Sequence, residues 1–482
     1  MIYFVAISIQ VLCILIFSLF GFHRLWLLWI YFRKKKQEES NENRFFGQYP
    51  VVTIQLPIYN EKYVVERLIE AVCHIDYPVE HLEIQVLDDS TDETQQIVNQ
   101  AVAKKQQEGF DIKAINRVIR RGYKAGALQE GLQQSRGELI LIFDADFIPP
   151  SDILKNAISY FDDPSVGMVQ FPWAHINRDY SLLTWTQAVM LDGHFNIEHY
   201  ARSRSGRFFN FNGTAGIWRK KCILDAGGWQ GDTLTEDFDL SYRAQLKGWQ
   251  FIFEPNRPIP AELPVELNAF KSQQYRWAKG SVQTAIKLIP KLLASSIPFK
   301  LKLEALFHMT ANINYLVMPI FILTLPVLVV CDACLPQYLH ILSFVGACLS
   351  IVFFYLIAQA SYFKENILKQ ILVIPILMAV GIGLSINNTR AILSALFARQ
   401  SDFIRTPKYN IFSRKDSWRH HSNYRVKATL YPFFELFFVG YLLWIFRLSF
   451  LHQAYYLMPF LALFVFGFAY FAMLTLRQTP IN

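Results

Sequence analysis

Charged residues are scarce in this chain of 482 residues. Asp, Glu, Lys and Arg make up 18% of it, whereas soluble globular domains average about 25%. Apolar residues reach 52%, and Phe, Tyr and Trp together reach 15%. This balance argues against an entirely soluble protein, and the length allows a large soluble domain together with membrane spans.

Cysteine is also rare, with six residues scattered along the chain. Cys331 and Cys334 form a CxxC pair in a short loop that we expect outside the cell. Because no second pair and no histidines accompany it, the pair favours a disulfide or two free thiols over a zinc site. The sequence shows no internal repeat and no low-complexity segment.

Acidic residues are outnumbered, 39 against 47 Lys and Arg, which gives a net charge of +8. The basic excess gathers at residues 33–36 and between residues 399 and 427, in each case beside an apolar run. Basic clusters that flank membrane spans mark the cytoplasmic side. The positive charge therefore does not indicate binding to nucleic acid.

The apolar runs predict an integral, multi-pass membrane protein. The run over residues 2–31 is too long for a signal peptide and no cleavage site follows it, so we expect an uncleaved anchor over 1–32. Further runs lie near 305–330, 338–361, 366–388, 428–449 and 454–475. If all of these runs crossed the membrane, the basic loop 398–427 would lie outside the cell, which its positive charge disfavours. We therefore expect 366–388, which holds Pro375, to be interfacial or re-entrant, leaving five spans and a cytosolic segment 51–276.

That segment predicts an α/β domain with a mostly parallel sheet. Strand-like runs alternate with amphipathic helices expected after Asn60, Asp92, Gly122 and Asp152. The expected strands are Val51–Leu56, Glu83–Leu87, Lys113–Ile119, Glu138–Phe143 and Val166–Phe171. Polar motifs follow several of these strands, at the edge where such sheets bind nucleotides.

Two motifs follow the second and fourth strands. Asp144 and Asp146 end a run apolar enough to be a buried strand, where acids are costly unless they are paired or bound to a metal. Their short side chains would leave positions for diphosphate oxygens around Mg²⁺ or Mn²⁺. Asp88 and Asp89 fit recognition of a base or ribose. In both cases capping of the following helix is the alternative.

Four weaker signals accompany them. Tyr59 could lie against a nucleobase while Asn60 caps a helix, and Lys124 begins a helix of the kind that favours phosphate. The acids of Thr235-Glu236-Asp237 suit a general base, although composition alone favours an ordinary helix start. The fragment Gln273-Gln274-Tyr275-Arg276-Trp277 could bind diphosphate and stack on a sugar, or could be an interfacial anchor.

In this order, the motifs resemble those of the processive family 2 glycosyltransferases of the cellulose-synthase superfamily. Residues 208–219, FFNFNGTAGIWR, are especially similar to the cellulose-synthase-like A and C proteins, as are residues 85–92 and 122–128. Those proteins make mannan or glucomannan and the glucan backbone of xyloglucan. The resemblance covers about residues 51–276 and implies a Rossmann-like GT-A domain inserted between transmembrane helices, with inverting transfer.

The resemblance also implies residue roles. Donor nucleotide contacts would come from Tyr59, Glu61, Asp88, Asp89, Lys124 and Asp144. Asp144 and Asp146 would hold Mg²⁺ or Mn²⁺. Asp237, with Glu236, would be catalytic. Acceptor and diphosphate contacts would come from Asn212, Gly213, Thr214, Gln273, Arg276 and Trp277.

A gating loop is implied by residues 403–408, FIRTPK, which are similar to the pattern FxVTxK of cellulose synthases. Phe403, Thr406 and Lys408 match that pattern, while Arg405 replaces the usual valine. The expected organisation is 1–32 anchor, 45–265 GT-A domain, 266–303 interfacial helices, 304–361 two spans, 366–427 interfacial helix and gating loop, and 428–476 two spans. Zinc-binding and cyclic-dinucleotide-binding domains of larger members are not expected.

Three functions remain open on the sequence. The first is transfer of a hexose from GDP-mannose or UDP-glucose to a growing β-linked, β-1,4 polysaccharide, with coupled translocation and with accessory or export subunits as partners. The second is non-processive synthesis of a glycolipid. The third is an inactive scaffold, which predicts a broken motif, and none is broken. The expected location is the inner membrane of a bacterium or the Golgi membrane of a eukaryote.

Overall fold

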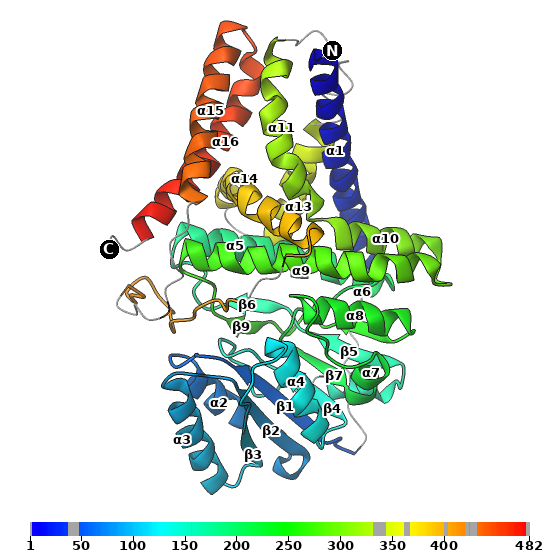
Figure 1. Cartoon of the computed structure of the whole chain (residues 1–482). Coiled ribbons are helices and arrows are strands. Elements are labelled where there is room, and N and C mark those ends of the chain that lie inside the picture. Colours follow the sequence, from blue (N-terminus) through cyan, green and yellow to red (C-terminus); the bar gives the residue numbers. More distant parts are fainter. Residues whose placement is uncertain are drawn as a thin grey trace.

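A computed structural model describes residues 2–36, 48–155, 157–330, 344–360, 367–399, 403–419, 424 and 431–478. An α/β domain forms its lower half, and long helices rise above it (Figure 1). Between them lies a layer of helices that includes α5 (Leu182–Gly193) and α9 (Leu267–Ala294). The fold is therefore organised as sheet, covering helices and apolar helices.

The main sheet has seven strands in the order β3-β2-β1-β4-β7-β5-β8. All five strands expected from the sequence are confirmed as β1–β5, and β7 alone runs antiparallel to its neighbours β4 and β5. Their bounds are β1 Val52–Ile58, β2 Leu82–Asp88, β3 Ile112–Asn116, β4 Leu139–Ile142, β5 Val166–Gln170, β7 Gly216–Arg219 and β8 Gln250–Phe253. A small second sheet pairs β6 (Trp173–His175) with β9 (Ile259–Ala261).

Burial explains the strand pattern. All residues of β4 are buried, and the apolar side chains of β1 and β2 pack into the same core. Continuous apolar runs are what a sheet covered on both faces requires. The parallel strands are joined by η1 Val79–His81, α2 Val65–Cys73, α3 Thr94–Gln107 and α4 Tyr123–Gln134. Three of the four expected helices are thus confirmed.

Two local predictions were wrong. The described residues after Asp152 form turns, followed by the short 3-10 helix η2 (Ile158–Asp162), in place of the expected helix. Asn60 does not cap α2. It has a left-handed φ of 55°, and its Oδ1 accepts a hydrogen bond of 2.8 Å from the backbone N–H of Thr91. Asn60 therefore ties the β1 loop to the β2 loop.

One long helix beneath the membrane part contains a π-helical turn. It consists of α5, then η3 (His194–His199), then α6 (Tyr200–Arg204). The remaining elements of the domain are α7 (Lys220–Asp225) and α8 (Glu236–Leu246), which begins at the predicted acidic motif. The π-turn changes the direction in which side chains leave the helix, and such turns often occur at functional sites.

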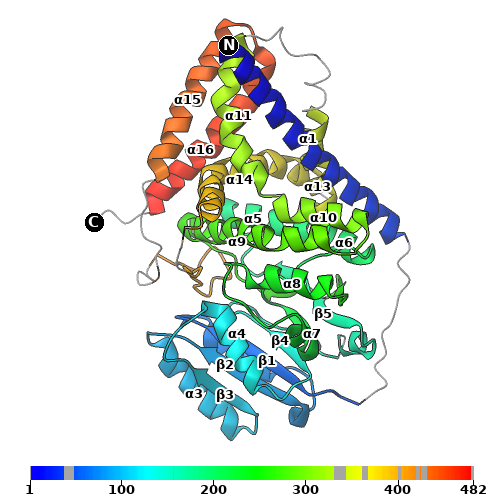
Figure 2. The same ribbon diagram turned by 45° about the vertical axis from the view of Figure 1, so that its right-hand side comes forward.

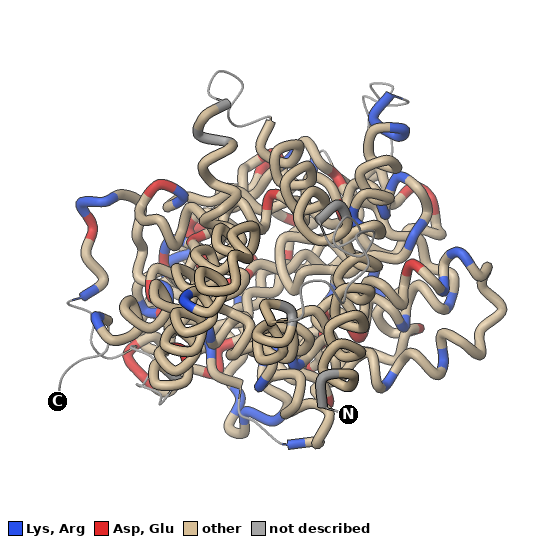
Figure 3. The backbone as a smooth tube through the Cα atoms, turned by 90° about the horizontal axis from the view of Figure 1, so that it is seen from above, with Lys and Arg blue, Asp and Glu red and all other residues tan. Residues whose placement is uncertain are grey.

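The apolar helices are α1 Ile2–Lys35, α10 Phe299–Thr310, α11 Ile313–Val330, η5 Phe344–Leu349, α13 Ser350–Gln359, α14 Ile367–Leu396, α15 Tyr431–Leu451, η7 Tyr455–Leu457 and α16 Met458–Gln478. Among the described residues, α1, α14, α15 and α16 are long and apolar enough to cross a membrane. A fifth candidate is the pair α10 and α11, bent by 59°. Figure 2 shows α1, α11 and the α15–α16 hairpin leaning together at the top, and Figure 3 shows few charges along the helices at the centre of the top view.

The arrangement of these helices agrees with several topology predictions without testing them. The α14 helix lies crosswise below α11 and α15 and packs against α9 (Figure 1). The basic end of α1 is on the side of the α/β domain. The expected boundary at 303/304 falls inside α10. Cys331 and Cys334, with parts of the basic loop, lie outside the described residues, so the spans and their orientation stay predictions.

A buried ion pair joins α9 to the α15–α16 hairpin. The Nζ of Lys271 lies 2.5 Å from Oε1 of Glu435 on α15, and it donates to Oγ1 of Thr475 on α16 at 2.8 Å. All three side chains are buried. Asn387 of α14 adds a hydrogen bond of 2.9 Å to the Lys271 carbonyl. Three separate apolar helices, α14, α15 and α16, thus converge on one residue of α9.

Candidate active site

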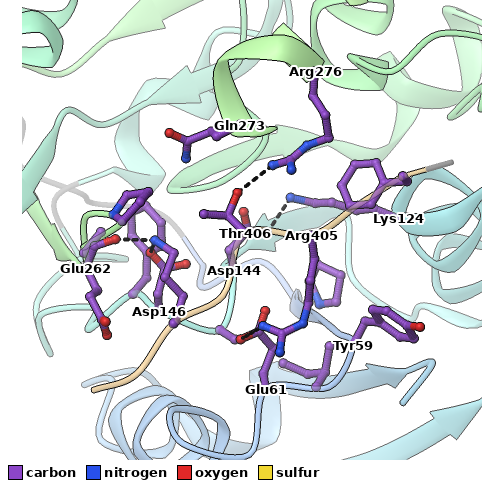
Figure 4. Close-up of a pocket in the computed structure, with 18 of the residues that line it drawn as sticks. Tyr59, Glu61, Lys124, Asp144, Asp146, Glu262, Gln273, Arg276, Arg405 and Thr406 are labelled. Carbon is purple, nitrogen blue, oxygen red and sulfur yellow. Dashed lines mark hydrogen bonds and ion pairs between the residues drawn. The ribbon is translucent and has the colours of Figure 1, made fainter. Parts of the chain in front are cut away.

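A cavity opens where β1, β2 and β4 end, below α9 (Figure 4). Most of the polar side chains predicted to act together meet there. Its lining includes Tyr59, Glu61, Asp89, Arg120, Lys124, Asp144, Asp146, Trp173, His175, Glu262, Gln273, Arg276, Phe403, Arg405, Thr406 and Lys408. Segments separated by more than 300 residues in the sequence therefore build one site.

The two carboxylates after β4 each face a lysine. Lys124 donates to Asp144 and also to the Gly213 carbonyl at 2.9 Å. Lys408 lies 2.6 Å from Oδ2 of Asp146. Burial raises the pKa of Asp144, and the Lys124 charge opposes that shift. The pair sits on a rigid strand end, as a binding site for a charged ligand requires.

The loop before β7 connects these carboxylates to the predicted base. Thr214 accepts a hydrogen bond of 2.9 Å from the Asp144 N–H. Gly213 has a left-handed φ of 81°, and a Cβ there would lie 3.1 Å from Oδ2 of Asp237. Glycine is required at this position because both the φ and the close approach exclude a side chain. Asp237 is thereby placed against the same loop that contacts Asp144.

Glu236 and Asp237 occupy the first turn of α8, and both are enclosed. Burial and the neighbouring Glu236 raise the pKa of Asp237 well above its ordinary value, and burial also raises the pKa of Glu236. Oδ1 of Asp237 accepts from the Phe238 N–H at 2.8 Å. The second oxygen of Asp237, beside Gly213, is the one suited to accept a proton from a substrate.

A pH profile tests this arrangement. If Asp237 is a base, transfer should rise with pH through its raised pKa, since only the deprotonated form accepts a proton. Replacing Glu236 with glutamine removes the neighbouring charge, so the acidic limb of the profile should move to lower pH. The measurement is the transfer rate at saturating substrates over pH 5–10 for wild type and E236Q. A limb that stays in place, or moves upward, contradicts the coupling.

The side of the cavity around Tyr59 and Asp89 is basic and aromatic. The guanidinium of Arg120 lies over the Tyr59 ring at 3.4 Å. Asp89 is bound by Arg117 through two hydrogen bonds, one of them 2.8 Å from Nε. Asp88 is buried below this group, accepts from the Ser90 N–H at 2.9 Å, and does not line the cavity. Asp89 is therefore the member of the pair that can reach a ligand, through or beside Arg117.

The predicted gating segment lies in the cavity. Arg276 donates to the Ile404 carbonyl and, at 2.9 Å, to Oγ1 of Thr406. Phe403 stacks on Tyr123 with ring centroids 5.8 Å apart, below the guanidinium of Arg276. Burial lowers the pKa of Arg276 to about 10, which leaves it charged at neutral pH. The α9 motif and the gating segment therefore act on each other directly.

Arg405, which departs from the family pattern, has a partner that the sequence did not reveal. Its Nη1 lies 2.9 Å from Oε2 of Glu61. Burial raises the pKa of Glu61 to about 8, and Arg405 opposes that shift. A valine at this position could not balance a buried carboxylate, whereas Arg405 places its charge beside Glu61.

Several lining residues were missed from the sequence. Trp173 and His175 on β6 line the cavity, and Nε1 of Trp173 and both ring nitrogens of His175 are buried without a hydrogen-bond partner. Burial lowers the pKa of His175 to about 3, so it is neutral. Glu262 receives backbone N–H bonds from Tyr409 and Asn410. Trp277, in contrast, is half-buried on α9 and is not among the lining residues.

The donor set at this site fits a divalent cation that is shared with a ligand. Asp144 and Asp146 offer carboxylate oxygens, the ligands that Mg²⁺ and Mn²⁺ prefer. Among the described residues, no group of three or more His, Cys, Asp or Glu side chains is arranged to hold a metal by itself. A cation bound here would thus need oxygens from a ligand such as a diphosphate to complete its coordination.

Comparison with known proteins assigns the class of the domain. Residues 50–280 match the family described as "Glycosyltransferase like family 2". The α/β part of this chain is therefore a family 2 glycosyltransferase domain. Its GT-A fold agrees with the resemblance in the motifs.

Curated proteins with similar sequences give a more specific comparison than the family match. The chain is 40% identical over 280 residues to glucomannan 4-beta-mannosyltransferase 1 of Cyamopsis tetragonoloba, covering 57% of this chain and 52% of that protein. It is 42% identical over 250 residues to a probable glucomannan 4-beta-mannosyltransferase 10 of Arabidopsis thaliana, covering 51% and 45%. The chain thus spans about half the length of the curated relatives it matches.

A solved structure supports the fold. The mannosyltransferase PcManGT of Pyrobaculum calidifontis, in complex with GDP-Man and Mn²⁺, superposes with a TM-score of 0.57. The alignment covers 81% of this chain and 100% of that one, at 21% identity. At this identity the likeness establishes the fold.

Proposed function

We propose that this protein is a membrane-bound, inverting hexosyltransferase that adds mannose from GDP-mannose to a growing β-1,4-linked polysaccharide. The observation that carries the proposal is the meeting of Asp144, Asp146, Lys124 and Arg276 in one cavity, with Asp237 close by, against Gly213. The sequence left GDP-mannose and UDP-glucose open. The mannosyltransferase relatives and the GDP-Man complex of the fold neighbour favour the first.

In this proposal the donor lies along the strand ends. The base would lie near Tyr59 and Asp89, and the diphosphate would lie between Asp144, Asp146, Lys124 and Arg276. Lys124 and Arg276 are cationic and half-buried, so each would stabilise negative charge that develops on the leaving diphosphate. A Mg²⁺ or Mn²⁺ ion held by Asp144 and Asp146 would supply further charge neutralisation there.

The acceptor would approach from the side of Asp237. Its hydroxyl proton would pass to the carboxylate of Asp237 as the oxygen attacks the anomeric carbon, and the diphosphate would leave from the opposite face. A single displacement of this kind inverts the anomeric centre. Gly213 leaves space for the acceptor oxygen beside Oδ2 of Asp237, and the segment 403–408 excludes water from the donor.

The membrane helices directly above the cavity fit a polymer that is released toward the bilayer. We propose that the domain is cytosolic, that the lipid bilayer surrounds α1, α11, α15 and α16, and that export subunits could receive the product. The chain would reside in a bacterial inner membrane or a Golgi membrane, according to its source.

The donor is tested with purified full-length protein in nanodiscs, with MnCl₂ and radiolabelled GDP-mannose or UDP-glucose. Label from GDP-mannose in ethanol-insoluble polymer that β-mannanase digests is the expected result. Polymer from UDP-glucose alone would overturn the donor assignment. Label in the lipid extract alone would establish the glycolipid function instead.

A further inference from the structure

The π-helical turn above the site places a histidine and a glutamate beside the acceptor loop. His194 and Glu198 are one helical turn apart on η3, with Nδ1 of His194 3.4 Å from Oε2 of Glu198. The other ring nitrogen of His194, Nε2, lies 2.9 Å from Nδ2 of Asn212. A continuous polar chain thus runs from Glu198 through His194 to Asn212.

The hydrogen-bonding roles of Glu198, His194 and Asn212 are linked, because each donor in the series needs an acceptor on its neighbour. Burial alone would raise the pKa of Glu198, but Arg202 and His194 together hold it well below its usual range, so it is an anion. The Glu198 carboxylate can only accept, so Nδ1 of His194 carries the N–H. Nδ2 of Asn212 lies 2.9 Å from Nε2 of His194, so in this arrangement the amide donates and Nε2 accepts. The orientation of the Asn212 amide is therefore linked to Glu198 through His194.

The remaining oxygen of Asn212 has no hydrogen-bond partner among the residues that the structure describes. Oδ1 is buried and accepts no hydrogen bond, whereas the backbone N–H of Asn212 donates to Gln170 at 2.9 Å. Buried polar atoms are seldom left unpaired. Asn212 directly precedes Gly213, the residue in contact with both Lys124 and Asp237. Asn212 is therefore one residue from the place where acceptor and donor would meet.

We propose that His194 and Glu198 are positioning residues that fix the Asn212 amide so that its Oδ1 accepts a hydrogen bond from a hydroxyl of the acceptor sugar. The inference rests on the proposed function, because it assigns a sugar hydroxyl to that oxygen. The ligand class is a hexopyranose chain end. The contact would orient the attacking hydroxyl toward Asp237.

A purely structural role for Glu198 has to be distinguished from its proposed role in positioning Asn212. Oε2 of Glu198 also lies 3.2 Å from Nη1 of Arg202. Nε of Arg202 lies 3.3 Å from Oε1 of Glu304 on α10. Replacing Glu198 with glutamine keeps an oxygen for Arg202 and almost the same volume. It removes the anion, however, and glutamine can donate to Nδ1 of His194. The ring would then carry its proton on Nε2, and the Asn212 amide would turn over.

The experiment compares E198Q, N212A and the double variant in the full-length protein in nanodiscs. The assays are the KM and kcat for a β-1,4-linked manno-oligosaccharide acceptor and the Kd for GDP-mannose. Each single variant should raise the acceptor KM about tenfold, as expected for one hydrogen bond, with donor affinity unchanged. The double variant should equal N212A, because Glu198 acts through Asn212. The matched control is E108Q, at an exposed residue paired with Lys105.

Additive losses in the double variant, a wild-type acceptor KM in E198Q, or a parallel loss of donor affinity would overturn the inference. A second measurement does not depend on activity: ¹⁵N spectra of histidine-labelled protein, with H194Q to assign the signal. Wild-type His194 should show a bare Nε2, and E198Q should protonate it. A protonated Nε2 in the wild type would refute the positioning chain even if transfer occurs. A correct tautomer without any transfer would refute the proposed function alone.

Discussion

Asp237→Asn should lower sugar transfer by about a thousandfold, within the range that general bases contribute. Asparagine keeps the shape of the side chain and can still accept the Phe238 N–H bond, but it cannot take a proton. Donor affinity should remain close to that of wild type, because Asp237 is not among the residues that line the donor cavity. The measurement is single-turnover transfer together with equilibrium binding of GDP-mannose.

The matched control for this variant is Asp111→Asn, an exposed aspartate paired with Arg136 at the far edge of the sheet. It should transfer sugar at the wild-type rate. Retention of a tenth or more of the wild-type rate by Asp237→Asn would exclude a base at this position. A large loss of donor affinity in the variant would show that Asp237 acts on the donor instead.

Asp146→Ala should abolish metal-dependent binding of the nucleotide sugar, with a loss of about a hundredfold or more. The variant removes one of the two carboxylates at the end of β4 and leaves Lys408 without its partner. The freed lysine can still attract a diphosphate, so weak binding that does not respond to Mn²⁺ should persist. Calorimetry with GDP-mannose, with and without EDTA, separates the two contributions.

Asp152→Ala provides the control, since this half-exposed aspartate pairs with Arg257 outside the cavity. Its binding should respond to Mn²⁺ as in the wild type. If wild-type binding is insensitive to EDTA, the assignment of a metal to Asp144 and Asp146 is wrong. If Asp146→Ala keeps its response to Mn²⁺, the cation is held elsewhere.

The strands and the acidic motifs were accessible from the sequence because their signals are local. A run such as Leu139–Ile142 can only be a buried strand or a buried helix, and the acids that follow it mark the strand end. The family resemblance then placed distant motifs in one site, and the cavity brings together Asp144, Arg276 and Lys408. The roles of these residues stay predictions until the variants are measured.

The rest depends on tertiary contacts that no local pattern encodes. Trp173 and His175 are unremarkable in sequence, and they line the cavity because β6 pairs with β9, more than 80 residues away. The bond between Asn60 and Thr91 competes with helix capping, and only the neighbouring loop decides which one forms. The partner of Arg405 is Glu61, which is far from it in the sequence. The sequence offered one usable signal for this contact, which was Arg405 at a position where the motif usually has valine. An arginine at an apolar position needs a counter-charge.

The Lys271 ion pair sets a limit on how this enzyme can be divided. The family match ends at residue 280, within α9, and Lys271 on that helix pairs with Glu435 of α15 and donates to Thr475 of α16. A truncated soluble fragment that kept the Gln273 and Arg276 motif would expose this lysine and the apolar face around it. Removing one partner of a buried pair typically costs about 3–5 kcal/mol. If Gln273 and Arg276 bind the donor as proposed, the helix that carries them is also held by α15 and α16, and movement of that hairpin would be transmitted to the cavity.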